Sequence, residues 1–257
     1  AVAEAGESWV VGREVIANCV EFNVSQTGYN VRVRRDARSP ARPDGRAITR
    51  LHYRFQIQGP EAHRIIERIH GGPIPDIRFF MVDTINIGTK RVRALRHGMA
   101  GAPGLEIWGP YDDKPYVRDT ILQAARDLGI DLRQVGSRAY PTNTLESGWI
   151  PNPLPAVYTG EGLMQRYREW LPVDSYEASG ALGGSFDSPD VRDYYVTPYD
   201  MGYANFIRFD HDFIGRQALE GMQGRRHRKK VTFEWNAEDV VRVFASMFGP
   251  SESHYKW

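Results

Sequence analysis

The chain has very little cysteine, because Cys19 is the only one among its 257 residues. One thiol cannot form an internal disulfide, and it cannot supply the thiolates of a zinc or iron–sulfur site. An excess of charge of one sign is also absent, since 33 Lys and Arg are balanced by 32 Asp and Glu. This balance creates no sustained field for a phosphate backbone or an anionic membrane. We therefore expect no nucleic acid and no membrane among the partners of this protein.

Long hydrophobic runs are missing as well. No stretch approaches the roughly 18 uncharged apolar residues of a transmembrane helix. The first residues also lack the basic-then-apolar layout of a secretory signal. A reducing, cytoplasmic location fits these absences and the single cysteine. The chain begins without Met, and its last residues, from Tyr255 to Trp257, complete no element. Both ends favour an internal fragment of a longer protein.

The common catalytic motifs do not occur in the chain. The histidines form no HExxH pair, and His211 beside Asp212 lacks further ligands at a usable spacing, so no metal site is expected. No GxSxG elbow, no P-loop and no GxGxxG after a strand is found. These absences disfavour serine hydrolysis, nucleotide hydrolysis and hydride transfer.

The residues that are present favour a folded α+β protein. Hydrophobic residues make up 41% of the chain and aromatic residues 12%, enough for a real core. Apolar patterning predicts a strand over 8–13, a helix over 14–26 and a strand over 29–33. The linker 34–46 is rich in Arg, Asp, Pro and Gly, which is typical of a solvated loop.

A second, longer unit repeats this theme. Residues 85–97 alternate around a possible turn at Gly88, while Pro60 and Gly129 suit the start of one helix and the end of another. The expected strands and helices alternate in the order β-α-β-β-α-β, which is the split βαβ unit of ferredoxin-like domains. Their ranges are 51–58, 59–70, 85–97, 104–109, 115–128 and 131–135. After Trp149 the chain becomes rich in Pro and Gly, with one last strand candidate at 229–235.

The segment RHGMAGAPGLEIWGP, residues 96–110, carries the clearest chemical signal. Gly98, Gly101 and Gly104 are spaced by three between two expected strands, and the second strand carries Glu106 next to Trp108. Glycines allow a close backbone approach, and a carboxylate can accept paired N–H donors from a flat heterocycle on which an aromatic ring stacks. The alternative is a structural hairpin with a solvated glutamate.

This segment resembles RTGYTGEDGFEI of the glycine-cleavage T-protein (aminomethyltransferase) family, with matches that include Arg96, Gly98 and Glu106. Three further stretches follow in the order of that family. They are FQIQGPEA at 55–62, GSRAYPTNTLESG at 136–148 and YDMGYANFIRFDHDFIGRQAL at 199–219. The resemblance covers about 165 residues in register, and we therefore identify the chain as a member of this superfamily.

The resemblance implies a fold and a cofactor. The family uses tetrahydrofolate and is built from two ferredoxin-like halves followed by a C-terminal β-barrel. By analogy, residues 1–46 are the back half of a truncated first repeat with its linker, 47–165 are the second repeat with the folate site, and 166–257 are a loop-rich segment leading into a mostly missing barrel.

The resemblance also assigns folate-binding residues. Glu106 would bind the N–H groups of the pterin, and Gln56, Phe79 and Trp149 would complete the folate pocket. The simpler alternatives are a core position for Phe79 and an ordinary strand position, with a satisfied amide, for Gln56.

Departures from the T-protein pattern narrow the activity. Tyr140 and Pro141 stand where the T-protein has Arg-Asp, and Thr144 replaces its second Arg. The surrounding sequence resembles tetrahydrofolate-dependent aryl-methyl-ether demethylases that act on vanillate- or syringate-type lignin fragments. That branch implies methyl transfer from a methoxybenzoate to N5 of tetrahydrofolate. Two other hypotheses remain open: an aminomethyltransferase or a demethylase of a sulfonium or N-methyl compound, and a folate-binding module without turnover.

Two residues are candidates for the demethylase chemistry. The phenol of Tyr140 has an ordinary pKa of about 10, which suits an acid that protonates a departing phenolate. The guanidinium of Arg13 can pair with a benzoate carboxylate through two hydrogen bonds. The alternatives are a packing tyrosine before a proline turn and a solvated arginine at a strand end.

Overall fold

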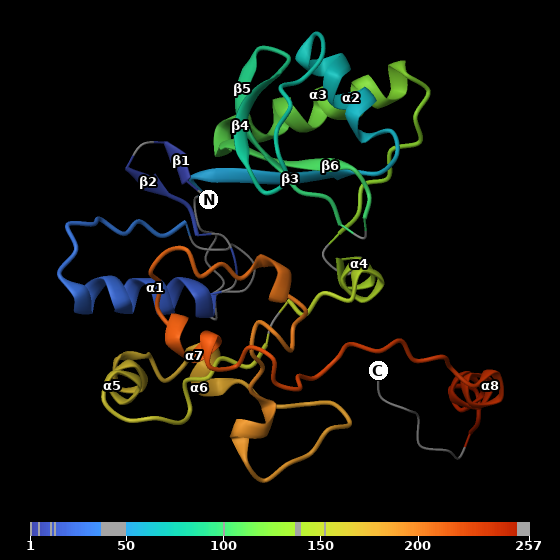
Figure 1. The fold of residues 1–257 in the computed structure, drawn as a ribbon. Helices are drawn as coiled ribbons and strands as arrows, with labels where there is room; N and C mark the ends of the chain where they lie inside the picture. The colour runs from blue at the N-terminus through green and yellow to red at the C-terminus, as the bar shows by residue number, and fades with distance from the viewer. Residues whose placement is uncertain are drawn as a thin grey trace. The chain divides into compact units, whose positions relative to one another are not determined.

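The protein is described here as a computed structural model covering residues 2–4, 6–10, 12, 14–36, 50–99, 101–136, 140–151 and 153–250. Two units are resolved within it, Ala1–Tyr195 and Val196–Trp257, and each is described by itself. The first unit contains an antiparallel sheet covered by helices, which confirms the α+β class (Figure 1). No helix in the described ranges is long and apolar enough to cross a membrane.

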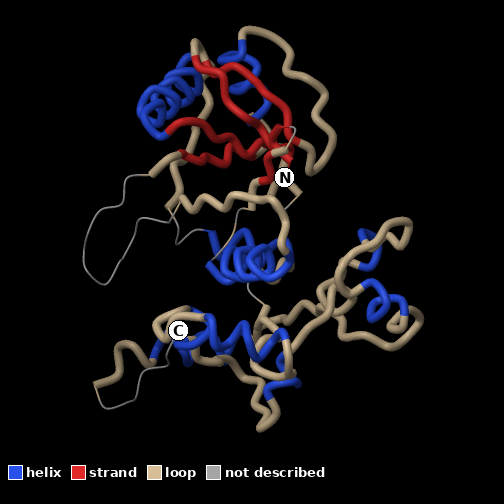
Figure 2. The backbone as a smooth tube through the Cα atoms, turned by 90° about the vertical axis from the view of Figure 1, so that its left-hand side faces the viewer, coloured by secondary structure: helices blue, strands red, loops and turns tan. Residues whose placement is uncertain are grey.

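The sheet of the first unit has four strands. They are β3 (His52–Gln58), β4 (Val82–Ile87), β5 (Lys90–Arg96) and β6 (Gly104–Pro110). Their order across the sheet is β3-β6-β5-β4, and every neighbouring pair is antiparallel. These are the long red strands of Figure 2, connected by loops that include the Gly-rich segment between β5 and β6.

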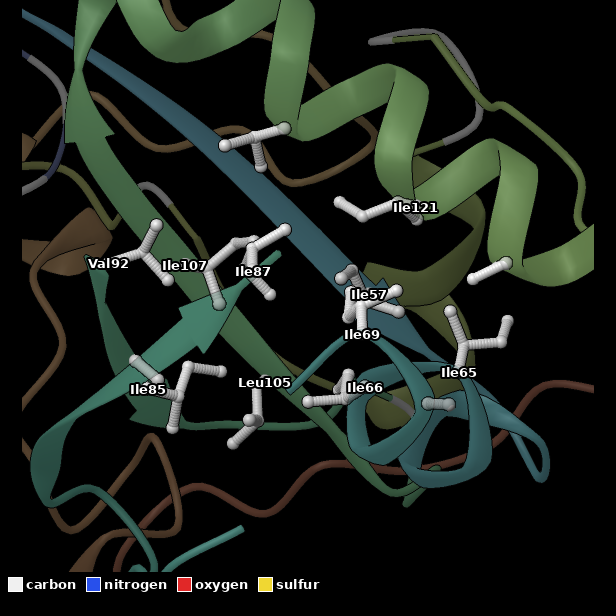
Figure 3. Packing of buried hydrophobic residues seen from close by; sticks show 14 of the residues in the cluster. Ile57, Ile65, Ile66, Ile69, Ile85, Ile87, Val92, Leu105, Ile107 and Ile121 are labelled. Atoms are coloured by element: carbon white, nitrogen blue, oxygen red, sulfur yellow. The ribbon is translucent and has the colours of Figure 1, made fainter. Parts of the chain in front are cut away.

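Two helices, α2 (Ala62–His70) and α3 (Lys114–Asp127), pack on one face of this sheet. The helix α2 begins two residues after the predicted start signal Pro60, and Gly129, the predicted end signal of α3, follows that helix by two residues with a φ of +66°. Gly71 in the left-handed conformation and Pro115 in the first turn bound the other two ends. Their apolar stripes meet Ile85, Ile87 and Ile107 of the sheet in one cluster (Figure 3). The cluster lies between the helices and the sheet, so the other face of the sheet is turned away from α2 and α3.

We call the opposite face of the sheet the polar face. The alternation of side chains along the strands shows which residues it carries. Tyr53 and Ile57 of β3 and Leu105 and Ile107 of β6 are buried in the helix-covered core. The residues between them therefore point the other way. The polar face carries His52, Arg54, Gln56 and Gln58 of β3 together with Glu106 and Trp108 of β6.

The amino-terminal part of this unit forms a second, smaller cluster. A short hairpin of β1 (Val2–Glu4) and β2 (Glu7–Ser8) precedes α1 (Glu14–Thr27), which packs with α5 (Leu163–Trp170) and α6 (Tyr176–Ser179). Phe22, Val157 and Tyr167 form its apolar centre. The buried carboxylate of Glu177 accepts hydrogen bonds from the amide of Asn18 and the hydroxyl of Tyr167. These bonds join α1 to two helices, α5 and α6, that lie far from it in the sequence.

The remaining elements are short. In the first unit they are η1 (Tyr111–Asp113), α4 (Tyr140–Ser147) and η2 (Val191–Tyr194). The second unit contains η3 (Ala204–Phe206), α7 (Arg216–Glu220) and α8 (Ala237–Ala245), separated by loops. Within it, the carboxylate of Asp200 accepts hydrogen bonds from Thr197 and from the backbone of Arg228, and the rings of Tyr199 and His227 stack at 4.6 Å.

The order of elements differs from the expected β-α-β-β-α-β. Residues 85–97 form parts of two strands, β4 and β5, because the chain reverses at the two-residue loop of Gly88 and Thr89. Residues 131–135 form no strand. The neighbouring Ile130 and Leu132 pack against the core, and Asp131 pairs locally with Arg133. The observed order is therefore β-α-β-β-β-α.

Three other expected strands are wrong. Of the described residues in the expected strand 8–13, only Ser8 lies in a strand, β2, whereas Trp9, Val10 and Gly12 do not. Residues 29–33 and 229–235 alternate in sequence, yet neither forms a ladder with any described part of the chain. Their apolar side chains are exposed, including Val31, Phe233 and Trp235. Alternation identifies a segment that fits a sheet, but a strand also requires a partner with unpaired backbone groups.

Candidate functional site

The Gly-rich loop between β5 and β6 depends on its glycines. A Cβ atom at Gly98 would collide with the backbone carbonyl of Ala102, and one at Gly104 would collide with the carbonyl of Ile57 on β3. These obstacles are backbone atoms, so they cannot move aside as a flexible side chain could. The loop is therefore folded tightly against the end of β3, as the close-approach interpretation of the motif predicts.

Two glutamines of β3 hold this loop from the polar face. The side-chain amide of Gln56 donates to the carbonyl of His97 at 2.7 Å. The backbone N–H of Met99 donates to the side-chain oxygen of Gln58 at 3.1 Å. The expected strand position of Gln56 is confirmed, and its amide N–H group is used to position the loop.

Glu106 lies directly opposite Gln56 in the β3–β6 ladder. Its side chain is only 15% exposed, and one carboxylate oxygen lies 3.2 Å from the guanidinium of Arg54. The alternative of a fully solvated glutamate is therefore wrong. Arg54 was missed by the sequence analysis, although its spacing of two from Gln56 places it on the same face of the strand.

The indole of Trp108 shares the polar face with Glu106, as its spacing of two predicts. It is buried, and its ring centroid lies 5.9 Å from that of Trp9, which in turn contacts the ring of His52 at 4.4 Å. The Nε1 atom of Trp108 and the Nδ1 atom of His97 are buried without a hydrogen-bond partner in the described part of the chain. Buried polar atoms are usually satisfied in native proteins, so each of these two atoms is free to bond to water or to a polar group of a ligand.

Phe79 lies in the turn that leads into β4. Its side chain is 57% exposed, so the core alternative for Phe79 is wrong. Its ring meets the ring of Phe80 at 4.7 Å, and Phe80 lies 5.3 Å from the ring of His97 in the Gly-rich loop. Phe79 is thus linked to the loop through Phe80, a residue that the sequence analysis did not single out.

The other candidates lie elsewhere. Trp149 follows α4, is partly exposed and donates its backbone N–H to the carbonyl of Thr144. Tyr140 begins α4, but its side chain is outside the described residues, as is the whole of Arg13. Of the candidates, Gln56 bonds to the Gly-rich loop, Glu106 lies opposite Gln56, and Phe79 reaches the loop only through Phe80. Within the described ranges, no group of three or more His, Cys, Asp and Glu residues could hold a metal ion.

A partly buried carboxylate on a sheet that also carries a tight Gly-rich loop can accept hydrogen bonds from the N–H groups of a small molecule. Comparison with known protein families identifies the family of this domain. Residues 24–151 match the GCVT N-terminal domain, and this part of the chain belongs to that family.

Individual relatives agree with the family match. The chain is 43% identical to syringate O-demethylase of Sphingobium sp. over 242 residues, which are 94% of this chain and 51% of that protein. It is 31% identical to sesamin methylene transferase of Sinomonas sp. over 199 residues, 76% of this chain and 43% of that protein. It is 27% identical to an aminomethyltransferase of Caldanaerobacter subterraneus over 190 residues, 72% of this chain and 40% of that protein. The chain thus spans about half the length, or less, of these relatives.

Proposed function

We propose that this chain belongs to a tetrahydrofolate-dependent O-demethylase. The enzyme moves a methyl group from a methoxybenzoate of the vanillate or syringate type to N5 of tetrahydrofolate, and it releases 5-methyltetrahydrofolate and a phenol. The observation that carries this proposal is the placement of Glu106, partly buried opposite Gln56 and beside the Gly-rich loop. The 43% identity to syringate O-demethylase supports the choice of substrate class.

The residues around Glu106 fit a pterin ring. An ionised carboxylate accepts hydrogen bonds only, and the amino-pyrimidine edge of a pterin offers adjacent N–H donors. The guanidinium of Arg54 lies 3.2 Å from this carboxylate and forms an ion pair with it. The exposed ring of Phe79 offers an apolar face to a flat heterocycle, and Trp149 would extend this pocket.

When bound, tetrahydrofolate supplies the nitrogen nucleophile that accepts the methyl group. Glu106 fixes the orientation of the pterin, and Gln56 keeps the Gly-rich loop in place through His97. Arg13 pairs with the substrate carboxylate and so aligns the methoxy carbon with N5. As the carbon–oxygen bond breaks, the hydroxyl of Tyr140 would donate a proton to the departing phenolate oxygen, and the proton displaced from the methylated nitrogen would return to the tyrosine through solvent. The reaction is redox-neutral, since one bond to carbon replaces another.

We also propose the three-part organisation that the family implies. Residues 1–46 would be the back half of a first ferredoxin-like repeat, 47–165 a second such repeat, and 166–257 a segment leading into a C-terminal β-barrel. The sheet supports the middle part of this division, because its four strands and both covering helices lie between His52 and Asp127. Limited proteolysis of the full-length protein tests these boundaries. We expect the protease to cut first near residues 46 and 165, and first cuts inside 47–165 would contradict this division.

Titration calorimetry with tetrahydrofolate tests the proposed binding site. In the full-length protein, Glu106→Gln replaces one acceptor oxygen by a donor, so the binding free energy should weaken by about 1.5–3 kcal/mol. Glu161→Gln is a matched control, because Glu161 is exposed and outside the site. Equal affinities of the parent and Glu106→Gln would remove Glu106 from the folate site.

A product assay separates turnover from binding. Formation of 5-methyltetrahydrofolate from vanillate or syringate supports the demethylase. Tight binding without any product would instead favour a folate-binding module.

A further inference from the structure

Three consecutive apolar side chains are exposed just before β4. Phe79, Phe80 and Met81 have exposed fractions of 57%, 59% and 51%. They belong to a β-turn in which the backbone N–H of Met81 donates to the carbonyl of Arg78 at 2.9 Å. Single exposed apolar side chains are ordinary on a protein surface, whereas a contiguous group of them is typical of a surface that binds something.

The turn is also strained. Phe80 occupies its third position with a φ of +62°, and it is the single non-glycine residue with positive φ among those described. Glycine or asparagine usually fills this position, because a Cβ atom makes the left-handed conformation unfavourable. A bulky aromatic residue persists there only when its surroundings hold it, and such strain is found most often at functional sites.

Arg96 stabilises the turn and the residue before it through three hydrogen bonds. Its carbonyl accepts from the N–H of Phe80 at 2.9 Å, and its own N–H donates to the carbonyl of Met81 at 3.1 Å. Its guanidinium donates to the carbonyl of Ile77 at 2.8 Å. Arg96 is the last residue of β5 and the first residue of the Gly-rich motif. It therefore connects the strained turn directly to the loop.

The rings presented by this turn lie beside the loop that Gln56 holds. Phe80 is 5.3 Å from the ring of His97, whose carbonyl accepts the amide hydrogen bond of Gln56. Gln56 in turn lies opposite Glu106. A continuous set of contacts thus runs from the carboxylate to the exposed rings.

We propose that Arg96 is a positioning residue of the folate site. It holds the turn of residues 78–81 in its strained form, so that Phe79 and Phe80 form an apolar wall for the flat ring bound at Glu106. This inference depends on the proposed binding of tetrahydrofolate. It assigns a role to the motif arginine, which contacts neither Glu106 nor Gln56 but acts through the turn.

The test combines binding and stability in the full-length protein. Arg96→Met keeps the length of the side chain but removes the bond to Ile77, so tetrahydrofolate affinity should fall about tenfold. Arg96→Lys should recover part of this loss, since one donor remains. Phe80→Gly relieves the strained conformation, so its melting temperature should equal or exceed that of the parent while affinity falls. Glu161→Gln is again the control, because Glu161 is exposed and lies outside both the turn and the Gly-rich loop.

A double-mutant cycle separates positioning from general folding. If Arg96 acts through Phe79, then Arg96→Met and Phe79→Ala together should weaken binding no more than the stronger single change. Additive losses, or a lowered affinity that follows a lowered melting temperature, would overturn the inference. The inference is also overturned if the parent binds tetrahydrofolate and both Arg96→Met and Phe80→Gly bind it with affinities within about twofold of the parent. A parent that binds no tetrahydrofolate overturns both this inference and the proposed function.

Discussion

Arg54 and Glu106 show how much of the site depends on single residues. The guanidinium lies on β3 and the carboxylate on β6, and their 3.2 Å contact runs diagonally across the ladder. The Gly-rich motif around Glu106 identified this residue, from sequence alone, as a candidate for ligand binding. The partner could not be identified in that way, because the register between β3 and β6 is set by non-local pairing. Arg96 was recognised as a motif residue, but its hydrogen bonds to the turn at Phe80 and Met81 were not foreseen, because they form only in the folded chain.

Tyr140 is the residue whose substitution most directly tests the chemistry. If its hydroxyl protonates the departing phenolate, Tyr140→Phe should lower kcat by about 10²–10⁴ with little change in tetrahydrofolate affinity. Single-turnover rates on vanillate and syringate measure this effect. Tyr29→Phe is a suitable control, because Tyr29 is exposed in the described structure. A Tyr140→Phe enzyme with parental rates would assign the acid to another group.

At the scale of elements, local signals predicted the three helices before residue 130, missed all the helices from α4 onward, and predicted the strands unevenly. Helices 62–70 and 114–127 carry their stripes and boundary residues within themselves, so they could be recognised from sequence. The strands at 29–33, 131–135 and 229–235 were wrong, because alternation alone does not supply a partner. The hairpin of β4 and β5 was foreseen only as a possible turn at Gly88.

The helix-covered core should dominate the stability of the first unit. Ile66 of α2 is fully buried in that core. Ile66→Ala should lower the free energy of unfolding by about 2–5 kcal/mol, through lost burial and a residual cavity. Urea unfolding measures the change. Ile16→Ala, at a more exposed site on α1, should stay within about 0.5 kcal/mol of the parent.

Asp36 connects the segment after α1 to the start of β3. Its carboxylate accepts hydrogen bonds from the backbone N–H groups of Leu51 and His52, both at 3.0 Å. Burial acts to raise the pKa of Asp36, but these two bonds and nearby Arg50 outweigh it and hold the pKa below its usual value. The stabilisation is therefore complete above the unfolded-state pKa, and it is lost as pH falls through the folded-state value.

This titration predicts how an Asp36→Asn variant behaves. The amide keeps one acceptor oxygen, so one of the two backbone bonds is lost and the variant should be less stable by about 1–2 kcal/mol near neutral pH. The difference between the parent and the variant should shrink as the pH falls below about 4. Urea unfolding across that range measures it, with Asp131→Asn as an exposed control. A difference that is constant with pH would show that the charge of Asp36 contributes nothing.

For the whole molecule, the central claim is a redox-neutral methyl transfer. The most direct measurement follows an isotope-labelled methoxy group of syringate in the full-length protein, with tetrahydrofolate and a metal chelator and without oxygen or a nicotinamide. The account predicts that the label appears on N5 of tetrahydrofolate, in an amount equal to the phenol formed. Label released as formaldehyde, or turnover that requires oxygen, NADH or iron, would contradict it.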